Sequence, residues 1–557
     1  MLLPLVTATA VLLFTYLYRE LRRRRFKQYA SFPQMPTSLL LGHLKHVDDF
    51  IKSGKPSGHP DLAFAAINEA LGRPPLMFLD LRPFGPPMVI VRNHEVAEQI
   101  VKPFKSYPYS LPKMPSVYGH MIHVTGPTSI LPSQIIVNGK SPTLWLIMSQ
   151  GEHWKQLRKQ FNPGFAPQHL MTMLPLILEK SSTFIERLED YASSGQPFSL
   201  IHLTGNLTFD IISSIVMNKD FGAQKTGQLS ESMKTYNELF QTYTSEQMDL
   251  PWFFTPRTEW KRRYLARRVR TTLRTVVYEA FANRRTTNTK LRSILSLSLR
   301  DVDALTPQAV DEACDQLSTF LFAGHDTTGI LLSWMLYELS RTPHALRAVR
   351  SELDVLFGLH PLPSAVQDRL LSPRGQELLH RMTYTSAVIK ETLRLWPPAG
   401  TARLTTPGTG VTVKTAAGEE YHLEGVHVYN CAIMIQRDPA VYGDSADEFV
   451  PERWLDGHGD HIPPGAWRAF ERGPRNCIGQ ELAMLEARVV IALVARYLDF
   501  VKVGIGELSV NEHGKPILDE KGHYKVTEEM YPTRQVTPKP IDGMMMKVQF
   551  RRRDREQ

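Results

Sequence analysis

The feature that most constrains the fold of this chain is one long apolar helix expected between Thr306 and Pro343. Thr306 is a suitable N-cap, Pro307 takes the first helical position, where proline is tolerated, and Pro343 ends the segment. About 34 residues at 1.5 Å rise per residue span roughly 50 Å. The middle is apolar on every side, so the helix is expected to be buried through the centre of the protein. These apolar residues are Leu317, Phe320, Leu321, Phe322, Ile330, Leu331, Leu332 and Trp334.

The centre of this helix carries residues that a core helix does not favour, in the run Ala323-Gly324-His325-Asp326-Thr327-Thr328. A helical glycine costs about 1 kcal/mol relative to alanine. A carboxylate in an apolar core needs partners or water. Two interpretations stay open from this helix alone: a site where chemistry occurs, or a kinked core helix whose aspartate is satisfied.

The rest of the chain shows further helical periodicity and a few short strand-like runs, which predicts a mostly α fold with small β sheets. No internal repeat or low-complexity linker follows about residue 45, which favours a single large domain. Helices are expected at 154–162, 168–192, 199–218, 229–246, 259–286, 307–341, 343–357, 375–396 and 480–497, and strands at 76–81, 88–91, 411–413, 426–429 and 545–550.

Composition excludes several classes of protein. The chain has 557 residues, of which 42% are hydrophobic, as in a folded globular protein. Its three cysteines are too few, and too widely spaced, for a disulfide framework or a zinc ribbon, and they fit a reducing compartment. The net charge of +9 suits an anionic membrane or an acidic protein partner. No block of basic residues is interleaved with aromatics, so we expect no nucleic-acid partner.

The N-terminus predicts a single-pass membrane anchor. Residues 2–18 are apolar apart from three threonines, and a basic run that includes Arg19, Arg22 and Lys27 follows. Seventeen residues can just span a bilayer, and the positive charge after the apolar run places the following chain in the cytosol. A cleaved signal peptide is the alternative, although its charge would precede the apolar run. We therefore expect an anchor at 1–18, a basic and proline-rich linker at 19–44 and a catalytic domain at 45–557.

A second chemical signal lies in the loop Phe470-Glu471-Arg472-Gly473-Pro474-Arg475-Asn476-Cys477-Ile478-Gly479, just before an apolar helix. Its glycines allow tight turns and close approach to a flat ligand. The N-terminus of a helix stabilises an anion, so the thiol of Cys477 should ionise easily. A thiolate that donates electron density to haem iron favours cleavage of dioxygen. Cys314 and Cys431 lack this setting and are expected to be inert and buried.

Four separated motifs in order resemble the cytochrome P450 family of haem-thiolate monooxygenases, in its microsomal form, from about residue 33 to 550. They are Trp154-x-x-x-Arg158, the central run 323–328, Glu391-x-x-Arg394 with Pro451-Glu452-Arg453, and the Cys477 loop. The resemblance implies that Cys477 is the iron ligand of heme b (iron protoporphyrin IX). It also implies that the haem is contacted by Trp154, Arg158, Gly324, Arg403, Phe470, Arg475 and Gly479.

The resemblance also assigns roles near the iron. Gly324 would open room for dioxygen, Thr327 would hydrogen-bond the oxygen bound at the iron, and Asp326 would relay protons through water. Glu391, Arg394 and Arg453 would form a buried structural triad. Two departures from the family pattern are Trp454, where phenylalanine is usual, and a second tryptophan, Trp145, in the region expected to meet the haem edge.

The function implied is a monooxygenase that uses dioxygen and NADPH-derived electrons to hydroxylate or oxidise an apolar organic substrate, with fungal secondary metabolites among the candidates. No nucleotide-binding fingerprint is present, so electrons would come from a partner, an NADPH-dependent flavoprotein reductase on the same endoplasmic-reticulum membrane. The apolar loop 248–254 and the basic helix after it predict a second membrane contact. Two alternatives stay open: a haem-thiolate isomerase or dehydratase without a reductase, and a non-catalytic haem sensor.

Overall fold

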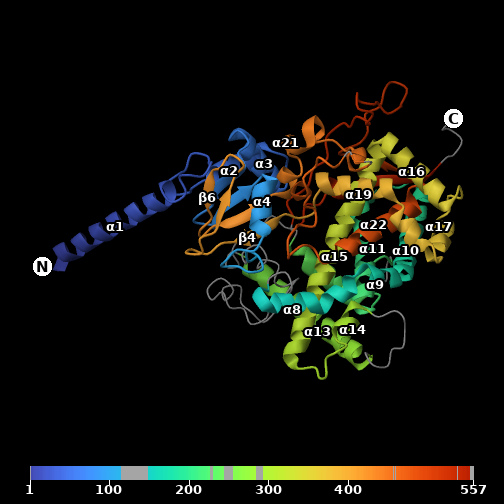
Figure 1. The fold of residues 1–557 in the computed structure, drawn as a ribbon, viewed down its shortest axis with the longest axis horizontal. Helices are drawn as coiled ribbons and strands as arrows, with labels where there is room; N and C mark the ends of the chain where they lie inside the picture. The colour runs from blue at the N-terminus through green and yellow to red at the C-terminus, as the bar shows by residue number, and fades with distance from the viewer. Residues whose placement is uncertain are drawn as a thin grey trace. The chain divides into compact units, whose positions relative to one another are not determined.

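The computed structural model describes residues 2–113, 149–225, 230–243, 255–283, 293–455, 457, 459–535 and 537–551. The chain divides into two compact units that alternate along the sequence (Figure 1). The first unit comprises Met1–Met114, Gly400–Gly443 and Pro463–Arg475. The second comprises Pro115–Ala399, Asp444–Ile462 and Asn476–Gln557. Helices dominate and the sheets are small, as the sequence predicted.

The first unit is built on a four-stranded mixed sheet in the order β1-β2-β7-β4. β1 (Leu76–Asp80) is antiparallel to β2 (Pro87–Val91), β2 is parallel to β7 (His427–Asn430), and β4 (Thr401–Leu404) is antiparallel to β7. β5 (Thr412–Lys414) and β6 (Glu420–His422) form a separate hairpin. The helices are α2 (Leu44–Ser53), α3 (Pro60–Ala70), α4 (His94–Val101), α20 (Ala432–Ile435), α21 (Pro439–Tyr442) and η6 (Pro464–Ala466).

The segment that links α1 to this sheet is part of the core of the first unit. Tyr29 and Phe32 are buried in the same hydrophobic cluster as Phe78 of β1. The ring of Phe32 lies 5.1 Å from that of Tyr421 between centroids. Residues of the segment expected to be a linker therefore contribute to the hydrophobic core of the first unit.

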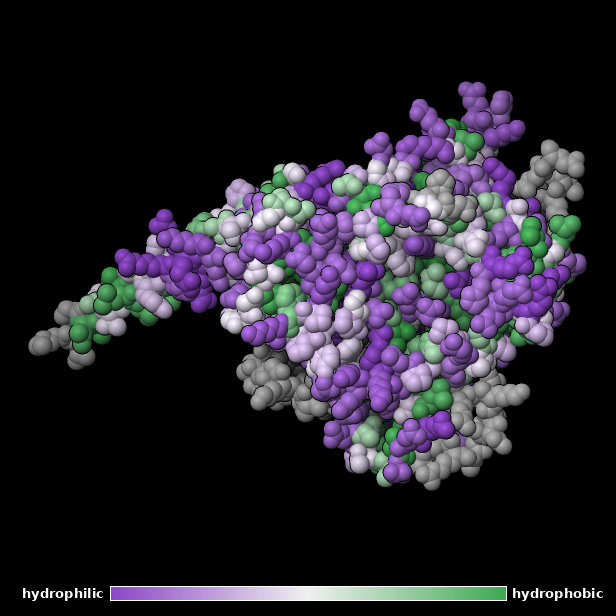
Figure 2. All heavy atoms as spheres, viewed as in Figure 1, coloured by the Kyte–Doolittle hydropathy of each residue, from purple (hydrophilic) through white to green (hydrophobic). Residues whose placement is uncertain are grey.

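α1 (Leu2–Phe26) continues eight residues beyond the predicted anchor. From Leu5 to Tyr18 its side chains are exposed, and Figure 2 shows apolar residues along it, followed by hydrophilic ones. The hydroxyls of Thr9 and Thr15 each donate to a carbonyl one turn earlier at 2.8 Å, so their polarity is satisfied within the helix. At the basic end, Arg25 is buried and pairs with Asp80 at 2.8 Å.

The second unit is a helical assembly with a three-stranded sheet, in which β9 (Met545–Phe550) lies between β3 (Phe198–Ser199) and β8 (Leu498–Lys502). Its helices are α8 (Gly151–Phe161), η1 (Asn162–Phe165), α9 (Pro167–Thr172), α10 (Leu174–Ser194), α11 (Leu200–Met217), α12 (Glu231–Gln241), α13 (Pro256–Asn283), α14 (Ile294–Ser298), α15 (Pro307–Arg341), α16 (Pro343–Phe357), α17 (Pro363–Leu371), α18 (Gly375–His380), α19 (Thr383–Leu395), η5 (Pro451–Trp454), α22 (Gln480–Val494) and η7 (Ile541–Gly543). η4 (Gly443–Ser445) lies where the chain passes from the first unit into the second.

α15 is the predicted central helix, and its ends are those expected. The Thr306 side chain accepts from the N–H of Ala309 at 3.1 Å, and Pro307 occupies the first turn. The helix is buried along most of its length and packs closely against α11. The hydroxyl of Thr204 on α11 donates to the carbonyl of Gly329 at 3.0 Å, and that of Thr208 to the carbonyl of His325 at 2.7 Å.

Among the described residues, one helix is long and apolar enough to cross a membrane, and it is α11. Because 72% of α11 is buried inside the protein, its apolar character is that of a core helix.

Two predicted helices are each divided in the structure. The segment 168–192 forms α9 and α10, because Pro175 lies in the first turn of α10 and lacks the N–H that a continuous helix needs. The segment 375–396 forms α18 and α19. Glu352 of α16 caps the second of these by accepting from the N–H groups of Tyr384 and Thr385 at 2.6 and 2.9 Å.

Candidate active site

Cys477 lies just before α22, as the sequence predicted, and it is the only exposed cysteine of the three. Gly479 is the N-cap of α22, and a Cβ built on it would lie 3.9 Å from the sulfur of Cys477. A Cβ at position 479 would therefore be in ordinary van der Waals contact with the sulfur. The N-terminal N–H groups of α22 provide a positive potential that stabilises a thiolate.

Arg158 of α8 supports the backbone immediately before Cys477. Its guanidinium donates to the carbonyl of Asn476 at 2.8 Å and to the side-chain oxygen of Asn476 at 3.0 Å. Burial lowers the pKa of Arg158, and the nearby Cys477 sulfur opposes this shift. Trp154, one turn earlier on the same face, is buried. The structure thus places the Arg158 cation against the residue before Cys477, where it interacts electrostatically with the thiol.

The central turn of α15 is partly exposed to solvent on one face of the helix only. Ala323, Gly324 and Thr327 are partly exposed, whereas Phe322, His325, Asp326 and Thr328 are buried. Residues 323 and 327 are one turn apart, so this opening follows a single face of the helix. The Thr327 hydroxyl donates to the carbonyl of Ala323 at 2.7 Å, which holds it against its own helix at this opening.

Gly324 has a packing role that the sequence did not reveal. A Cβ at this position would lie 2.6 Å from Cγ1 of Ile212 on α11, which is too close for any side chain. The glycine therefore permits the close approach of α11 and α15. Its expected role, to open room for dioxygen, stays a prediction.

Asp326 is buried, and both of its carboxylate oxygens have partners far along the chain, the nearer of them 211 residues later. The hydroxyl of Thr537 donates to Oδ2, and the ammonium of Lys539 lies 2.7 Å from Oδ1. Neither partner could be predicted from the sequence, because no local pattern links the C-terminal segment to α15. Asp326 and Thr327, the predicted pair, thus have separate hydrogen-bond partners in this structure.

His325 lies within a cage of aromatic rings. The ring centroids of Phe209, Tyr236 and Phe240 are 5.6, 5.8 and 5.5 Å from that of His325. Burial lowers the pKa of His325 and outweighs the opposing effect of Asp326, so the imidazole is neutral near pH 7. Its Nδ1 contacts the carbonyl of Leu321 at 2.7 Å, within the helix.

The structure brings together the three residues of the predicted triad. Oε1 of Glu391 accepts from Arg394 at 2.8 Å and from Arg453 at 3.0 Å, and Oε2 accepts from Arg394 at 2.9 Å. Burial raises the pKa of Glu391, but the two guanidinium groups outweigh it, so the pKa lies below its usual value. Trp454, the departure noted in the sequence, donates its indole N–H to Oε2 at 2.9 Å. This tryptophan gives Glu391 a donor that phenylalanine could not supply.

The other predicted haem contacts lie in the first unit. Arg403 on β4 is fully buried and donates to the carbonyl of Leu111 at 3.2 Å. Burial raises the pKa of Glu471, but Arg468 and Arg403 outweigh it, so that the pKa is lowered. Phe470 packs edge-on against Trp467, with ring centroids 5.9 Å apart. Arg475 is partly buried.

The remaining predictions at the site have mixed outcomes. Cys314 and Cys431 are buried, and burial raises the pKa of each thiol, that of Cys314 to about 12, as expected for inert cysteines. The basic helix predicted to face a membrane is α13, and two of its cations point inward instead. Arg262 lies over the ring of Tyr243, 4.1 Å from its centroid, and Arg270 pairs with Asp315 at 2.5 Å. Trp145 and the loop 248–254 lie outside the described residues.

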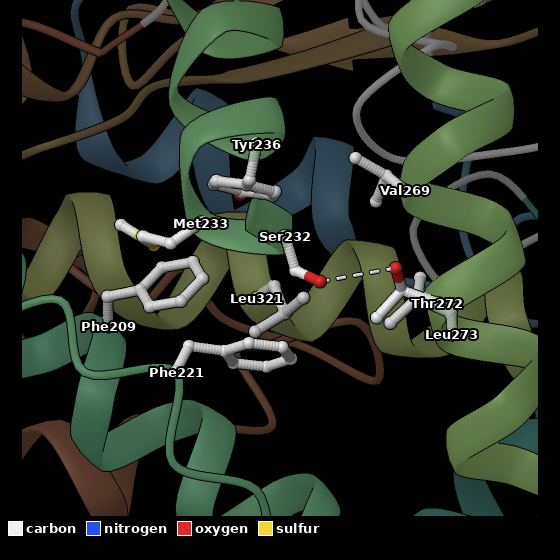
Figure 3. Close-up of a pocket in the computed structure, with 9 residues that line it drawn as sticks. All are labelled: Phe209, Phe221, Ser232, Met233, Tyr236, Val269, Thr272, Leu273 and Leu321. Carbon is white, nitrogen blue, oxygen red and sulfur yellow. Dashed lines mark hydrogen bonds between the residues drawn. The ribbon is translucent and has the colours of Figure 1, made fainter. Parts of the chain in front are cut away.

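A small apolar cavity of about 20 Å³ lies among α11, α12, α13 and α15. Figure 3 shows its lining, with Tyr236 of α12 and Leu321 of α15 on either side and the Ser232–Thr272 hydrogen bond (3.4 Å) at one edge. The volume suits about one water molecule. This cavity is therefore too small to hold an organic substrate.

Comparison with known proteins agrees with this geometry. The family model of cytochrome P450 matches residues 136–516. The chain is 30% identical to cytochrome P450 monooxygenase acrF of Aspergillus aculeatus, covering 79% of this chain and 87% of that protein. It is also 30% identical to cytochrome P450 monooxygenase polC of Polytolypa hystricis, covering 87% of this chain and 85% of that protein.

The fold is likewise similar to that in the crystal structure of the cytochrome P450DA heme domain. The TM-score is 0.67 at 19% identity, over 94% of this chain and 98% of that domain. The family match at residues 136–516 includes the Cys477 loop, α15 and the Glu391 triad. The chain therefore belongs to the cytochrome P450 family, and it is an enzyme of the P450 monooxygenase type.

Proposed function

We propose that Cys477 holds the iron of heme b as a thiolate and that the enzyme uses dioxygen to oxidise an apolar organic substrate. The observation that carries this proposal is the setting of Cys477: an exposed thiol just before α22, with the Arg158 guanidinium hydrogen-bonded to the preceding residue, Asn476. This donor chemistry fits a thiolate-bound haem, whereas the other two cysteines are buried. Among the described residues, no group of three or more His, Cys, Asp or Glu side chains is placed to hold a metal ion.

Several residues would hold the cofactor. The cations Arg158, Arg403 and Arg475 and the indole of Trp154 would bind the propionates. Phe470 and Gly479 would pack close to the sulfur side of the ring. The haem, once bound, supplies the activation of dioxygen, while the protein supplies orientation and electrostatics.

The open face of α15 would meet the substrate and the oxygen. Thr327 would present its hydroxyl there, after release from the Ala323 carbonyl, and would hold a proton at its Oγ1. Asp326 would pass protons to this hydroxyl through water. Phe322, Ala323 and residues 398–400 would line the pocket, and the apolar side chains among them would favour an apolar substrate.

We further place the electron supply outside this chain. An NADPH-dependent flavoprotein reductase would dock on the basic surface, and α1 would anchor the enzyme in the endoplasmic-reticulum membrane with the catalytic part in the cytosol. The exposed apolar side chains of α1, such as Leu12 and Phe14 at 71% and 72% exposed, support that anchor. The fungal origin of the two relatives above supports a secondary metabolite as substrate.

A second membrane contact would involve the outer face of α13. Trp260 and Tyr264 are exposed, and their rings stack 5.9 Å apart. The exposed cations Lys261, Arg267 and Arg268 lie beside them, a combination that suits an anionic lipid surface.

The test is reconstitution with a flavoprotein reductase, NADPH and a panel of apolar substrates, in which product, NADPH consumption and hydrogen peroxide are measured together. We expect Thr327→Ala to bind substrate but to divert most NADPH into peroxide, whereas Thr327→Ser, which keeps the hydroxyl, should resemble the wild type. Equal product yield per NADPH in wild type and Thr327→Ala would contradict the role of Thr327. Turnover without reductase would favour the isomerase or dehydratase alternative.

A further inference from the structure

Asp326 needs a counterion, because a carboxylate that is only 4% exposed loses most of its hydration. Three titratable side chains approach it from the elements packed around it: His325 on α15, Tyr236 on α12 and Lys539 in the C-terminal segment. His325 lies 3.9 Å away between Nε2 and Oδ1. Burial keeps His325 neutral by lowering its pKa, and burial together with Asp326 raises the pKa of Tyr236. Lys539 is therefore the cation that balances Asp326.

Lys539 lies at the boundary between this buried carboxylate and the solvent. Its side chain is 18% exposed, and its ammonium lies 4.7 Å from the centroid of the Phe240 ring on α12. A cation over an aromatic face is stabilised where it has lost part of its hydration. The ammonium is thus held by two elements of the second unit, α15 and α12.

The backbone around Lys539 is fixed by its own hydrogen bonds. The N–H of Thr533 donates to the carbonyl of Lys539 at 2.7 Å, and the N–H of Lys539 donates to the carbonyl of Thr537 at 2.8 Å. The N–H of Ile541 donates to the carbonyl of Tyr531 at 3.0 Å. These hydrogen bonds join the described residues 531–535 and 537–541, called here the C-terminal loop, and Thr537 and Lys539 of this loop contact the two oxygens of Asp326.

We infer that the C-terminal loop is a latch on the proton-handling carboxylate, with Lys539 as its positioning residue. While the latch is closed, both oxygens of Asp326 are occupied, and the carboxylate has no direct hydrogen bond to Thr327. Proton delivery to Thr327 then requires Asp326 to exchange the Thr537 hydroxyl for water, while Lys539 keeps the carboxylate in place. This inference rests on the proposed function for its consequence in turnover, but the latch itself is a property of the protein fold.

The experiment compares four variants of the haem-loaded full chain. Lys539→Met removes the charge at similar length, Lys539→Arg keeps the charge, Thr537→Val removes the hydroxyl, and Lys547→Met removes an exposed cation of β9 as a matched control. Hydrogen–deuterium exchange of the amides in residues 531–541 is measured in the resting enzyme, without NADPH. Product per NADPH is measured separately with reductase and a substrate.

We expect exchange in the C-terminal loop to be about tenfold faster in Lys539→Met, since a hydrogen bond to a charged group is lost. Lys539→Arg and Lys547→Met should stay close to the wild type, and Thr537→Val should lie between. Product per NADPH should fall about tenfold in Lys539→Met and recover in Lys539→Arg, as expected when a group that orients a functional residue is lost and restored.

Unchanged exchange in Lys539→Met would overturn the latch, and so would product per NADPH that stays at the wild-type value in that variant. Loss of product in Lys539→Arg as severe as in Lys539→Met would also overturn the positioning role, because arginine retains the charge. Failure of the proposed function would look different: the wild type itself would form no product with reductase, while the exchange result would still report on the latch.

Discussion

Replacement of Glu391 by glutamine should destabilise the protein strongly, although the side chain keeps its size. The fully buried carboxylate accepts five hydrogen bonds: from two nitrogens of Arg394, from Arg453, from Trp454 and from the N–H of Val450. Oε1 accepts three of these and Oε2 accepts two. A glutamine that keeps its oxygen at the Oε1 position directs its NH₂ group at two donors, Arg394 and Trp454.

The magnitude follows from this arrangement. Two hydrogen bonds are lost, at least one to a charged group, and two buried guanidinium groups lose their counterion. The expected loss in the free energy of unfolding is about 3–5 kcal/mol, the range found when one partner of a buried ion pair is removed. The assay is urea unfolding followed by circular dichroism, with haem content measured on the same samples.

The matched control is Glu377→Gln. Glu377 also pairs with two arginines, Arg374 and Arg381, at 3.0 and 3.5 Å, but on the surface. Because water screens such pairs, this variant should unfold at nearly the wild-type urea concentration. Equal effects of the two substitutions would refute the reasoning, since it assigns the loss to the burial of Glu391 and to the donors that surround it there.

Three further predictions concern other parts of the molecule. Burial lowers the pKa of His427 to about 4. As the pH falls, this imidazole therefore takes up a proton in the unfolded chain at a higher pH than in the folded protein. The free energy of unfolding should therefore drop by about 3 kcal/mol between about pH 6.5 and 4 because of this residue. The variant His427→Leu should show a smaller drop over the same pH range. An unchanged slope of the free energy of unfolding against pH in this variant would contradict the prediction. Iodoacetamide should label Cys477 before Cys314 and Cys431 in haem-free protein, as read by peptide mass spectrometry, and equal labelling would refute their burial. Gly324→Ala should cost about 1–3 kcal/mol in urea unfolding, because its Cβ meets Ile212; a neutral result would show that α11 can shift.

Features that depend on local sequence could be predicted well. Thr306, Pro307 and Pro343 define the ends of α15, and the glycines around Cys477 place it before α22, because caps and turns are set by neighbouring residues. The resemblance to the family grouped Glu391, Arg394 and Arg453, which lie together in the structure.

Features that depend on distant residues could not be predicted. The break between α18 and α19 depends on Glu352 of another helix, and the partners of Asp326 come from the C-terminal loop. Arg262 and Arg270 look like surface cations by composition, yet tertiary contacts bury Arg262 and partly bury Arg270. Trp454 was visible as a departure from the family, but its indole hydrogen bond required the position of Glu391.

The most direct test of the account is the spectrum of the purified, haem-loaded protein after reduction and addition of carbon monoxide. Cys477 as a thiolate ligand predicts the strongly red-shifted Soret band of a thiolate-bound ferrous carbonyl. Cys477→Ser should lose that band, whereas Cys314→Ser should keep it. A wild-type spectrum like that of a histidine-bound haem, or a red-shifted band that survives Cys477→Ser, would contradict the assignment of Cys477.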